Sequence, residues 1–575
     1  MWEKYKEADP RETVERIRNA LAGVGVRMEP VYMHPVGNVV SVLLRDPKHG
    51  FETYGKGTSE EWALASAYGE AAERFQNRMA YPIPEPEDGV DPLFHEWPDE
   101  ERITLAEALC APYIAEDLAR HYTDPEVSAE EFLRELYGTD TVSAVPFLSV
   151  RQDTTVMLPE RIIGTLCGSN GLASGNTYDE ALCQGLCEAA ERYAKFYMIR
   201  ENIPLVTVPE EEIARRAPEL LGIMKEIEKG TGCRMTVRDA RPVTGFPVLQ
   251  VLLTDSVRQK YYSRFGCHPV FMIALERCIT ELLQGQEDIT RLSTMLSWPQ
   301  ERETGSYRNL GDSVKADLGD LTDEFLSGVT DAEFESWPET AFTNRDGVRE
   351  LISRFLRIAP DVYIRKTGFL GIPSVRIHIP GVTPLPFRYS SKVIEYNQVR
   401  ELLHDPYLMN RKPDRKTLEQ MYNAFTAEDS LVGSRMDWRP VGIGYDEMKG
   451  LLLYMLSRDH EAAEAFGKAV SSCGKCMHHQ LRLRAEGKEP KVRQAVLELF
   501  FGKKTAVFTE MVCADRENAL ATWLDPTGLY RQFVSAVLHA DITSPLRELD
   551  KAVKERMKTV YDGRSPDQRN GVFAQ

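Results

Sequence analysis

The chain lacks the features that would direct it into or across a membrane. It has no uninterrupted apolar run approaching the roughly 18 residues needed to span a bilayer. Its N-terminal segment, MWEKYKEADPRETVERIRNAL, has neither the apolar core of a signal peptide nor an Arg-rich, acid-poor transit pattern. We therefore expect a cytoplasmic protein without a membrane partner.

Positive charge is scarce as well. The formal net charge is −18, from 70 Lys and Arg against 88 Asp and Glu, and no run rich in Lys and Arg reverses it locally. Such a chain repels a polyanion, so we expect no nucleic-acid partner. An anionic nucleotide is not excluded, because a few Arg side chains and a metal ion decide the local potential.

The common phosphate-binding loop is also missing. The nearest string, Gly502-Lys503-Lys504-Thr505, lacks the upstream glycine and the Gly-Lys-Thr order. The ten cysteines are scattered rather than arranged as a disulfide framework. Cys183 and Cys187 fit the apolar face of a helix, where free thiols behave as small hydrophobic side chains.

The composition is that of an ordinary globular protein, and 575 residues exceed one compact core. Strand-like runs occur at Val39–Leu44, Pro247–Leu253 and Val375–Ile379, between helical patterns. Mixed strands and helices up to about residue 400 predict an α/β or α+β catalytic domain, which we place at residues 1–430.

The texture changes near Tyr445. Asp446–Met455 and His460–Val470 form the pattern of an antiparallel helix pair, and helical periodicity continues without convincing strands. We predict a linker at residues 431–444 and an all-α domain at residues 445–575.

One segment of the catalytic region occurs three times. Gly57–Phe75, GTSEEWALASAYGEAAERF, aligns without a gap on Gly175–Tyr193, GNTYDEALCQGLCEAAERY, with eight of nineteen positions identical. A weaker third copy is GCHPVFMIALERCITELLQG, with Ala274-Leu275 set under Ala63-Leu64. The shared template is a Gly-containing turn, a helix with an Ala/Leu stripe, and a Glu near its end.

The repeated helices carry clustered charges. Residues spaced i, i+3 and i+4 share one helix face, which groups Glu70 with Glu73 and Arg74. In the second copy the same spacing groups Glu188 with Glu191 and Arg192. Singly, each cluster reads as a solvated surface pair. Their recurrence in register indicates carboxylates that need a cation, and oxygen ligands suit Mg²⁺ while the Arg side chains suit phosphates.

Together the strings GKGTSEEWALASAYGEAAERF, SNGLASGNTYDEALCQGLCEAAERY and HPVFMIALERCITELLQGQ resemble the three ATP-binding signature segments of the YcaO family. The resemblance extends over nearly the whole chain and is nearest to the stand-alone bacterial branch, which carries a tetratricopeptide-like helical region at its C-terminus. It implies an enzyme that uses ATP and Mg²⁺ to phosphorylate a backbone amide oxygen. That branch has been linked to methylthiolation of a small-subunit ribosomal protein.

The resemblance also assigns residues to roles. The glutamates that would bridge Mg²⁺ are Glu70, Glu188, Glu191 and Glu281. The nucleotide and phosphate contacts would be Lys6, Thr13, Glu73, Arg74, Asn176, Glu180, Arg192 and Arg277. This chain departs from the family pattern at Ala173, where the bacterial relative has a hydroxyl side chain, and Ser174 beside it is the candidate substitute.

Azoline formation is disfavoured as the product. The chain ends in NGVFAQ rather than in the Pro-rich tail of azoline-forming branches, and only 54 residues precede the first motif. Several functions stay open: an accessory factor in ribosomal protein methylthiolation, a thioamide-forming enzyme with a separate partner, a nucleotide-binding scaffold whose C-terminal helices dock partners, or a small-molecule kinase or ligase. We expect a homodimer that acts on a peptide or protein substrate.

Two further signals compete with this reading. Cys473, Cys476, His478 and His479 lie within seven residues, but structural zinc sites usually draw their ligands from two separated segments. We favour a helix C-terminus that stops at Gly474. His268 could reach a phosphate or serve helix entry and packing.

Overall fold

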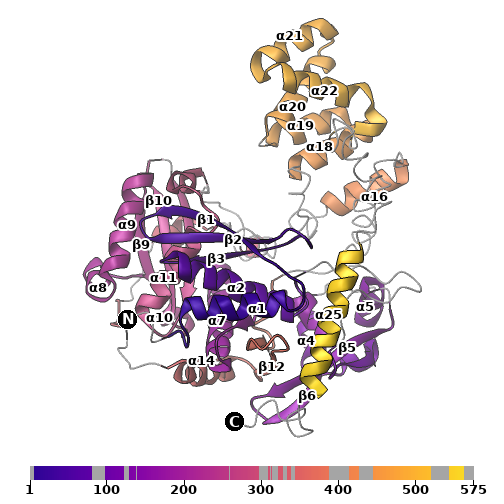
Figure 1. Cartoon of the computed structure of the whole chain (residues 1–575). Coiled ribbons are helices and arrows are strands. Elements are labelled where there is room, and N and C mark those ends of the chain that lie inside the picture. The colour runs from indigo at the N-terminus through magenta and orange to yellow at the C-terminus, as the bar shows by residue number, and fades with distance from the viewer. Residues whose placement is uncertain are drawn as a thin grey trace. The chain divides into compact units, whose positions relative to one another are not determined.

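The structure is a computed structural model of the whole chain (Figure 1). It describes residues 5–80, 97–121, 128–137, 139–257, 259–294, 296, 309–310, 313, 321–327, 333–337, 343–386, 414–426, 445–469, 471–519, 523 and 543–562. Two compact units divide the chain: Met1–Arg120 with Asp140–Phe387 and Thr543–Gln575, and His121–Thr139 with Arg388–Ile542. The predicted linker, 431–444, lies outside the described residues.

Among its described residues, the first unit contains three sheets, and every strand pair in them is antiparallel. Separate helices and antiparallel sheets make this unit α+β. The first sheet has the order β1 (Glu29–Val36), β2 (Val39–Asp46), β3 (Phe51–Gly57). The second has the order β11 (Lys260–Cys267), β10 (Val248–Asp255), β9 (Arg234–Asp239), β8 (Val206–Thr207). The third has the order β4 (Glu101–Thr104), β5 (Thr141–Ser149), β12 (Tyr363–Thr367), β13 (Ser374–His378), β7 (Leu172–Ser174), with β6 (Thr154–Pro159) on β5.

Helices cover these sheets. In the first unit they are α1 (Pro10–Ala22), α2 (Glu60–Gln76), α3 (Leu105–Leu109), α4 (Ile114–His121), α6 (Glu160–Cys167), α7 (Tyr178–Glu201), α8 (Glu210–Arg216), α9 (Pro218–Thr231), α10 (Arg241–Thr244), α11 (Phe271–Leu282), η2 (Ile289–Thr294), α13 (Asp323–Ser327), α14 (Asn344–Ile358) and α25 (Thr543–Asp562). The three strand-like runs named above became β2, β10 and β13, which confirms them as strands.

Each sequence repeat is one strand followed by one helix: β3–α2, β7–α7 and β11–α11. Ser59 and Thr177 stand at equivalent positions, and each caps its helix by accepting a hydrogen bond from a backbone N–H of the first turn. Before each cap is a glycine. A Cβ on Gly57 or on Gly175 would lie 2.6 Å from the nitrogen of Ala63 or Ala181, so only glycine lets the strand end meet the helix so closely.

The packing of strand against helix repeats as well, with one exchange. A Cβ on Gly55 would lie 2.2 Å from the Ala63 carbonyl oxygen, and one on Gly266 would lie 2.5 Å from that of Ala274. In the second copy the strand carries Ala173 and the helix supplies the glycine, because a Cβ on Gly185 would already lie 3.4 Å from the Ala173 Cβ. The Ala/Leu stripe of the sequence is thus the face that lies against the strand.

The three repeats contact one another in a cycle. α2 packs on its own strand β3 and also contacts β7, α7 contacts β11, and α11 contacts β3. In Figure 1, the β1–β3 sheet accordingly lies beside both α2 and α11. Equivalent residues of the three helices are therefore brought toward a shared centre.

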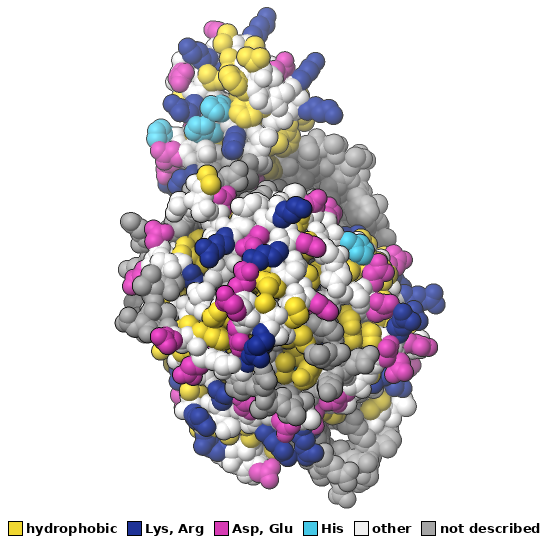
Figure 2. Space-filling view, turned by 90° about the vertical axis from the view of Figure 1, so that its left-hand side faces the viewer, with side chains coloured by type: hydrophobic (Ala, Val, Ile, Leu, Met, Phe, Trp, Pro, Cys, Tyr) yellow, Lys and Arg dark blue, Asp and Glu magenta, His cyan; other side chains and the backbone are white. Residues whose placement is uncertain are grey.

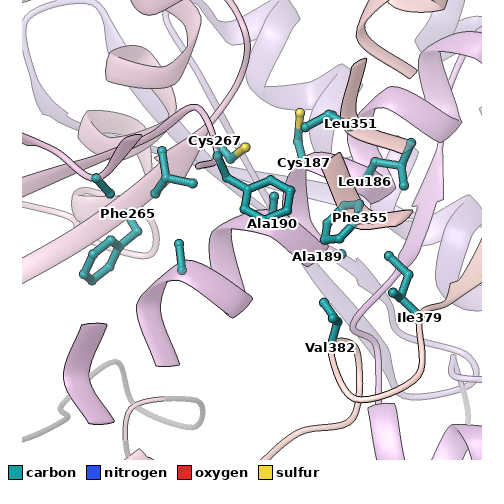
Figure 3. Close-up of a cluster of buried hydrophobic side chains, with 14 of the residues drawn as sticks. Leu186, Cys187, Ala189, Ala190, Phe265, Cys267, Leu351, Phe355, Ile379 and Val382 are labelled. Carbon is teal, nitrogen blue, oxygen red and sulfur yellow. The ribbon is translucent and has the colours of Figure 1, made fainter. Parts of the chain in front are cut away.

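A hydrophobic core surrounds α7 (Figure 3). Leu186, Cys187 and Ala190 of α7 face residues of β11 and α14, including Phe265 and Phe355. The predicted packing role of Cys183 and Cys187 is confirmed, since their exposed fractions are 2% and 0%. Burial on this scale fixes the helix that carries the second acidic cluster.

The second unit is helical throughout its described residues. Its elements are α5 (Ala129–Tyr137), α16 (Arg415–Thr426), α18 (Tyr445–Met455), α19 (Asp459–Lys468), α20 (Ser472–Ala485), α21 (Pro490–Phe501), α22 (Lys503–Ala514) and η3 (Arg516–Asn518). The predicted helix pair is α18 with α19. None of the helices described in either unit has the length and apolarity of a membrane span.

The predicted helix end at Gly474 is wrong. Ser471 accepts a hydrogen bond from the Gly474 backbone N–H and caps the start of α20, so Gly474 lies in the first turn. The glycine is needed there for space: a Cβ would lie 2.4 Å from the Cβ of Ala469. The sequence rule for glycine at helix ends failed because tertiary packing decided this position.

Candidate functional site

The end of α2 carries the first acidic cluster. The Arg74 guanidinium lies 2.5 Å from a Glu73 carboxylate oxygen and 3.1 Å from one of Glu70. Burial raises the pKa of Glu73 to about 8, and the carboxylates of Glu188 and Glu70 add to the rise while Arg74 opposes it. Glu73 is therefore a buried carboxyl group whose ionisation two other carboxylates oppose.

The second cluster lies on α7. Arg192 pairs with Glu188 at 3.1 Å, and no described residue donates a hydrogen bond to Glu191. Burial raises the pKa of Glu191, and Arg277 and Lys56 oppose that rise. The charge of Glu188 on α7 raises the pKa of Glu73 on α2, so carboxylates of the two helices lie close enough to interact.

The third copy contributes a single carboxylate. Glu281 near the end of α11 forms an ion pair with Lys56 of β3, whose ammonium also donates to the Gln284 side chain at 2.9 Å. Gln284 and Gly285 stand where the first copy has Glu73 and Arg74. Burial lowers the pKa of Lys56 to about 8, although the charges of Glu191 and Glu70 work in the opposite direction.

Sequence reasoning did not select Lys56. The signal was present, because Lys56 lies between the two glycines of the GKG string that opens the first motif. Those glycines pack β3 against α2, and the side chain between them reaches α11. The contact of α11 with β3, which the sequence does not reveal, places the Lys56 side chain beside α11.

A second group of predicted residues gathers at the start of α7. Lys6 pairs with Glu180 at 3.1 Å, Thr13 donates to the Asn176 side-chain oxygen at 2.9 Å, and Asn176 donates to Glu180 at 3.0 Å. Burial works to raise the pKa of Glu180, but Lys6 and a hydrogen bond from the Glu7 backbone N–H lower it overall. Arg16, which the sequence did not indicate, donates to Asn176 at 2.8 Å.

The two groups adjoin at the start of α11. Burial raises the pKa of Glu276 to about 7, and Arg277 and Lys6 both oppose that rise, so Glu276 lies near a cation from each group. Arg277 donates to the side chain of Gln184 on α7. Glu276 and Gln184 were not predicted, because neither belongs to the part of the repeat that recurs identically.

Two uncertain positions take definite roles. Ser174 donates a hydrogen bond to the Gly69 carbonyl oxygen at 2.6 Å, so its hydroxyl links β7 to α2 and keeps only lone pairs for another donor. His268 is 4% exposed, and its Nδ1 accepts from the Val270 backbone N–H at 3.0 Å. That bond is a helix-entry contact at the start of α11. Burial lowers the pKa of His268 well below its usual range.

The cysteines and histidines of α20 engage protein groups. Cys476 lies 3.3 Å from the Thr509 hydroxyl, and His478 Nδ1 lies 2.6 Å from the Ala463 carbonyl oxygen. No three His, Cys, Asp or Glu side chains among the described residues gather in a form that could hold a metal ion, either on α20 or at the repeated helices. At the repeated helices, Glu70, Glu188 and Glu281 are paired with Arg74, Arg192 and Lys56 instead.

The chemistry of the gathered residues matches a metal nucleotide. Glu70, Glu188, Glu191 and Glu281 offer only carboxylate oxygens, the ligands that Mg²⁺ prefers, and it usually completes its shell with phosphate oxygens and water. Arg74, Arg192 and Arg277 lie among them and provide planar donors for phosphate. Burial raises the pKa of Glu73, and the charges of Glu188 and Glu70 add to the rise, so added positive charge would favour its ionised form. On the face shown in Figure 2, by contrast, basic and acidic side chains are mixed over the surface.

An α+β domain of three strand–helix repeats, with carboxylates and guanidinium groups at its centre, belongs to the class of ATP- and Mg²⁺-binding proteins. The chain is a member of the YcaO family: residues 54–383, more than half of it, match the family model described as YcaO cyclodehydratase, ATP- and Mg²⁺-binding. Its cofactors are those of the family, ATP and Mg²⁺.

Similar proteins come from several organisms. The chain is 30% identical over 392 residues to the ribosomal protein S12 methylthiotransferase accessory factor YcaO of Escherichia coli, a match that spans 66% of each chain. It is 28% identical over 439 residues to an uncharacterized protein of Haemophilus influenzae, spanning 74% of this chain and 73% of that one. A solved YcaO structure from Methanopyrus kandleri, bound with AMPPCP and Mg²⁺, is 20% identical with a TM-score of 0.39, covering 66% of this chain and 93% of the other.

Proposed function

We propose that this protein uses ATP and Mg²⁺ to activate a backbone amide of a peptide or protein by phosphorylating its oxygen. The single observation that carries the proposal is that carboxylates of all three repeated helices act on the same cation, because Lys56 pairs with Glu281 while the charges of Glu191 and Glu70 also act on it. A site with excess negative charge and buried guanidinium groups is suited to a metal-bound triphosphate. The family match supports the same cofactors.

Each group of residues has a distinct role in this proposal. Glu70, Glu188, Glu191 and Glu281 hold Mg²⁺, which when bound neutralises phosphate oxygens. Arg74, Arg192 and Arg277 bind phosphates, with Glu73 holding Arg74 in place at 2.5 Å. Lys6, Thr13, Asn176 and Glu180, joined by hydrogen bonds at the start of α7, contact the rest of the nucleotide, and Ser174 offers its lone pairs beside them.

The reaction balances without a residue that forms a covalent bond. A nucleophile adds to the amide carbonyl carbon, and the resulting oxyanion attacks the γ-phosphorus of ATP, so that ADP leaves and the oxygen carries the phosphoryl group. The chain's own residues bind, orient and stabilise charge, which is what phosphoryl transfer chiefly requires. No nucleophile on the protein is invoked.

We further propose that the substrate is a protein, and that the reaction assists methylthiolation of a ribosomal protein. Support comes from the accessory-factor name of the Escherichia coli relative. The test is quantitative mass spectrometry of the proteome with the gene, without it, and with Glu188→Gln in its place. We expect a ribosomal-protein peptide to change mass only with the unaltered gene. If Glu188→Gln restores the modification in full, the protein acts as a scaffold rather than as an enzyme.

The assembly and location of the protein belong to the same proposal. We propose a homodimer, because the family resemblance implies one and twofold dimers are the commonest oligomers. We propose the cytoplasm as its location. The helical second unit, for which a tetratricopeptide-like fold is our prediction, is the proposed docking region for a partner protein. Light scattering over a broad concentration range should give twice the mass of one chain, and a single-chain mass throughout would contradict the dimer.

A further inference from the structure

Lys56 occupies a position that the threefold repeat defines. Lys56, Ser174 and Cys267 are equivalent residues, each at or next to the end of its strand. Each acts on a helix of another copy: Ser174 donates to the Gly69 carbonyl oxygen at 2.6 Å, and Cys267 lies near enough to Cys187 of α7 to raise the pKa of that thiol. Lys56 follows the same pattern, because its ammonium contacts α11.

The third repeat has no cation of its own at this place. In α2, Arg74 lies 3.1 Å from Glu70, and in α7, Arg192 lies 3.1 Å from Glu188. The equivalent of these arginines in the third copy is Gly285, beyond the end of α11. Lys56 takes their place from β3, since it pairs with Glu281 and donates to Gln284 at 2.9 Å.

The ammonium lies among carboxylates of all three repeated helices. It contacts Glu281 of α11, while the charges of Glu191 on α7 and Glu70 on α2 also act on it. These three glutamates are among the four proposed to hold Mg²⁺. The side chain is 27% exposed, so its attraction to them is weakly screened. A divalent cation bound by the same carboxylates would repel Lys56.

We propose that Lys56 is the resident counter-cation of the acidic centre, by which we mean the carboxylates of Glu70, Glu188, Glu191 and Glu281. It holds Glu281 in the metal-free protein and gives this carboxylate up when a divalent cation binds. Lys56 is a positioning residue rather than a catalytic residue, because it sets the metal affinity of the site through competition for Glu281. The inference rests on the proposed function in one respect, namely that the metal binds at these carboxylates.

The first test measures binding of Mn²⁺ alone to the full chain, from the paramagnetic resonance signal of free Mn²⁺, so that activity plays no part. Lys56→Met keeps the length of the side chain and removes its charge. We expect its Mn²⁺ dissociation constant to fall about tenfold. Lys225→Met is the matched control, because Lys225 pairs with Glu210 and Glu228 on the surface at 2.7 and 3.2 Å, and it should bind Mn²⁺ as the unaltered protein does.

A second measurement does not depend on the folding of the variant. In the unaltered protein, the acylation rate of each lysine is followed by mass spectrometry with and without Mg²⁺. We expect the reactivity of Lys56 to rise severalfold with Mg²⁺ and that of Lys225 to stay constant, because only Lys56 loses its carboxylate partner. In Glu281→Gln, Lys56 should be reactive already without metal.

The outcomes separate this inference from the proposed function. If Lys56→Met binds Mn²⁺ with unchanged or lower affinity, or if Mg²⁺ leaves Lys56 equally protected, the counter-cation role is overturned while the ATP site stands. If Lys56→Met weakens binding of a non-hydrolysable ATP analogue without tightening Mn²⁺, Lys56 is a phosphate ligand and the proposal is wrong. Failure of the unaltered protein to bind Mn²⁺ with that analogue would overturn the proposed function itself.

Discussion

Two glutamates that each pair with arginine on their own helix have opposite pKa shifts. On α8, Arg215 and Arg216 hydrogen bond to Glu212 and lower its pKa to about 2. On α2, Arg74 lies as close to Glu73, yet burial and the neighbouring carboxylates raise the pKa of Glu73 to about 8. Burial makes the largest difference, and Glu188 of the sister helix α7 adds to it, whereas hydrogen bonds from two arginines dominate at Glu212.

The comparison shows what a charged motif can and cannot indicate. An isolated Glu and Arg at helical spacing stabilise each other by a few tenths of a kcal/mol. The same residues crowded against carboxylates from other helices form a site that needs a cation. Recurrence of the motif in register is therefore more informative than the motif, and the predictions that follow test this distinction.

The largest effect is expected for the central carboxylates. Glu188→Gln and Glu281→Gln keep side-chain size but remove charges that the metal needs, so ATP turnover should fall about a thousandfold or more while the fold stays intact. ATPase rates and thermal melts measure the two separately.

Two control variants change carboxylates outside the repeated helices. Glu212→Gln removes the equivalent charge from the surface pair, and Glu107→Gln alters a carboxylate whose role is to cap α3. Both should leave turnover unchanged. Near-normal turnover in Glu188→Gln and Glu281→Gln would make the acidic helices structural and refute the central assignment.

The next effect concerns the metal. The carboxylates at the centre repel a triphosphate unless a divalent cation lies between them, so ATP should bind only with Mg²⁺ or Mn²⁺. Calorimetric titration with excess chelator should show affinity reduced by about a hundredfold or more. Equal affinity with and without metal would mean that the guanidinium groups alone hold the nucleotide.

A third prediction tests the packing that brings the helices together. Gly55→Ala would place a Cβ 2.2 Å from the Ala63 carbonyl oxygen, which forces β3 away from α2 and should destabilise the protein by about 3 kcal/mol. Gly222→Ala in α9 meets no atom within 4 Å and should stabilise by about 0.5 kcal/mol. Chemical denaturation of both variants measures the difference, and equal stabilities would show that β3 and α2 adjust freely.

Much of this arrangement could be predicted from the sequence. The repeats, the strands at β2, β10 and β13, and the α18–α19 pair follow from periodicity that local residues determine. The residues that come together from different repeats could not be predicted in the same way. Lys56 and Gln184 act on α11 from other elements, and only the cyclic packing of the repeats brings them there. Gly474 misled for the related reason that a tertiary contact, not a helix end, requires it.

The smallest effect is a difference in the sign of pH dependence, measured without metal. Glu212 has a folded pKa of about 2, below its ordinary 4.5, so its stabilising contribution is present above pH 4.5 and is lost as the pH falls through about 2. Glu73 has a folded pKa of about 8, so the folded state binds the extra proton between pH 4.5 and 8, and stability falls as the pH rises through this window.

Relative to the unaltered protein, Glu212→Gln should therefore be less stable at pH 7 by about 0.5 kcal/mol. Glu73→Gln should gain relative stability from pH 5 to pH 9, by about 1–2 kcal/mol. Denaturant unfolding in chelator at several pH values measures both differences, and saturating Mg²⁺ should suppress the second and leave the first. If the two variants respond to pH with the same sign, then burial and the neighbouring carboxylates do not raise the pKa of Glu73 above that of Glu212.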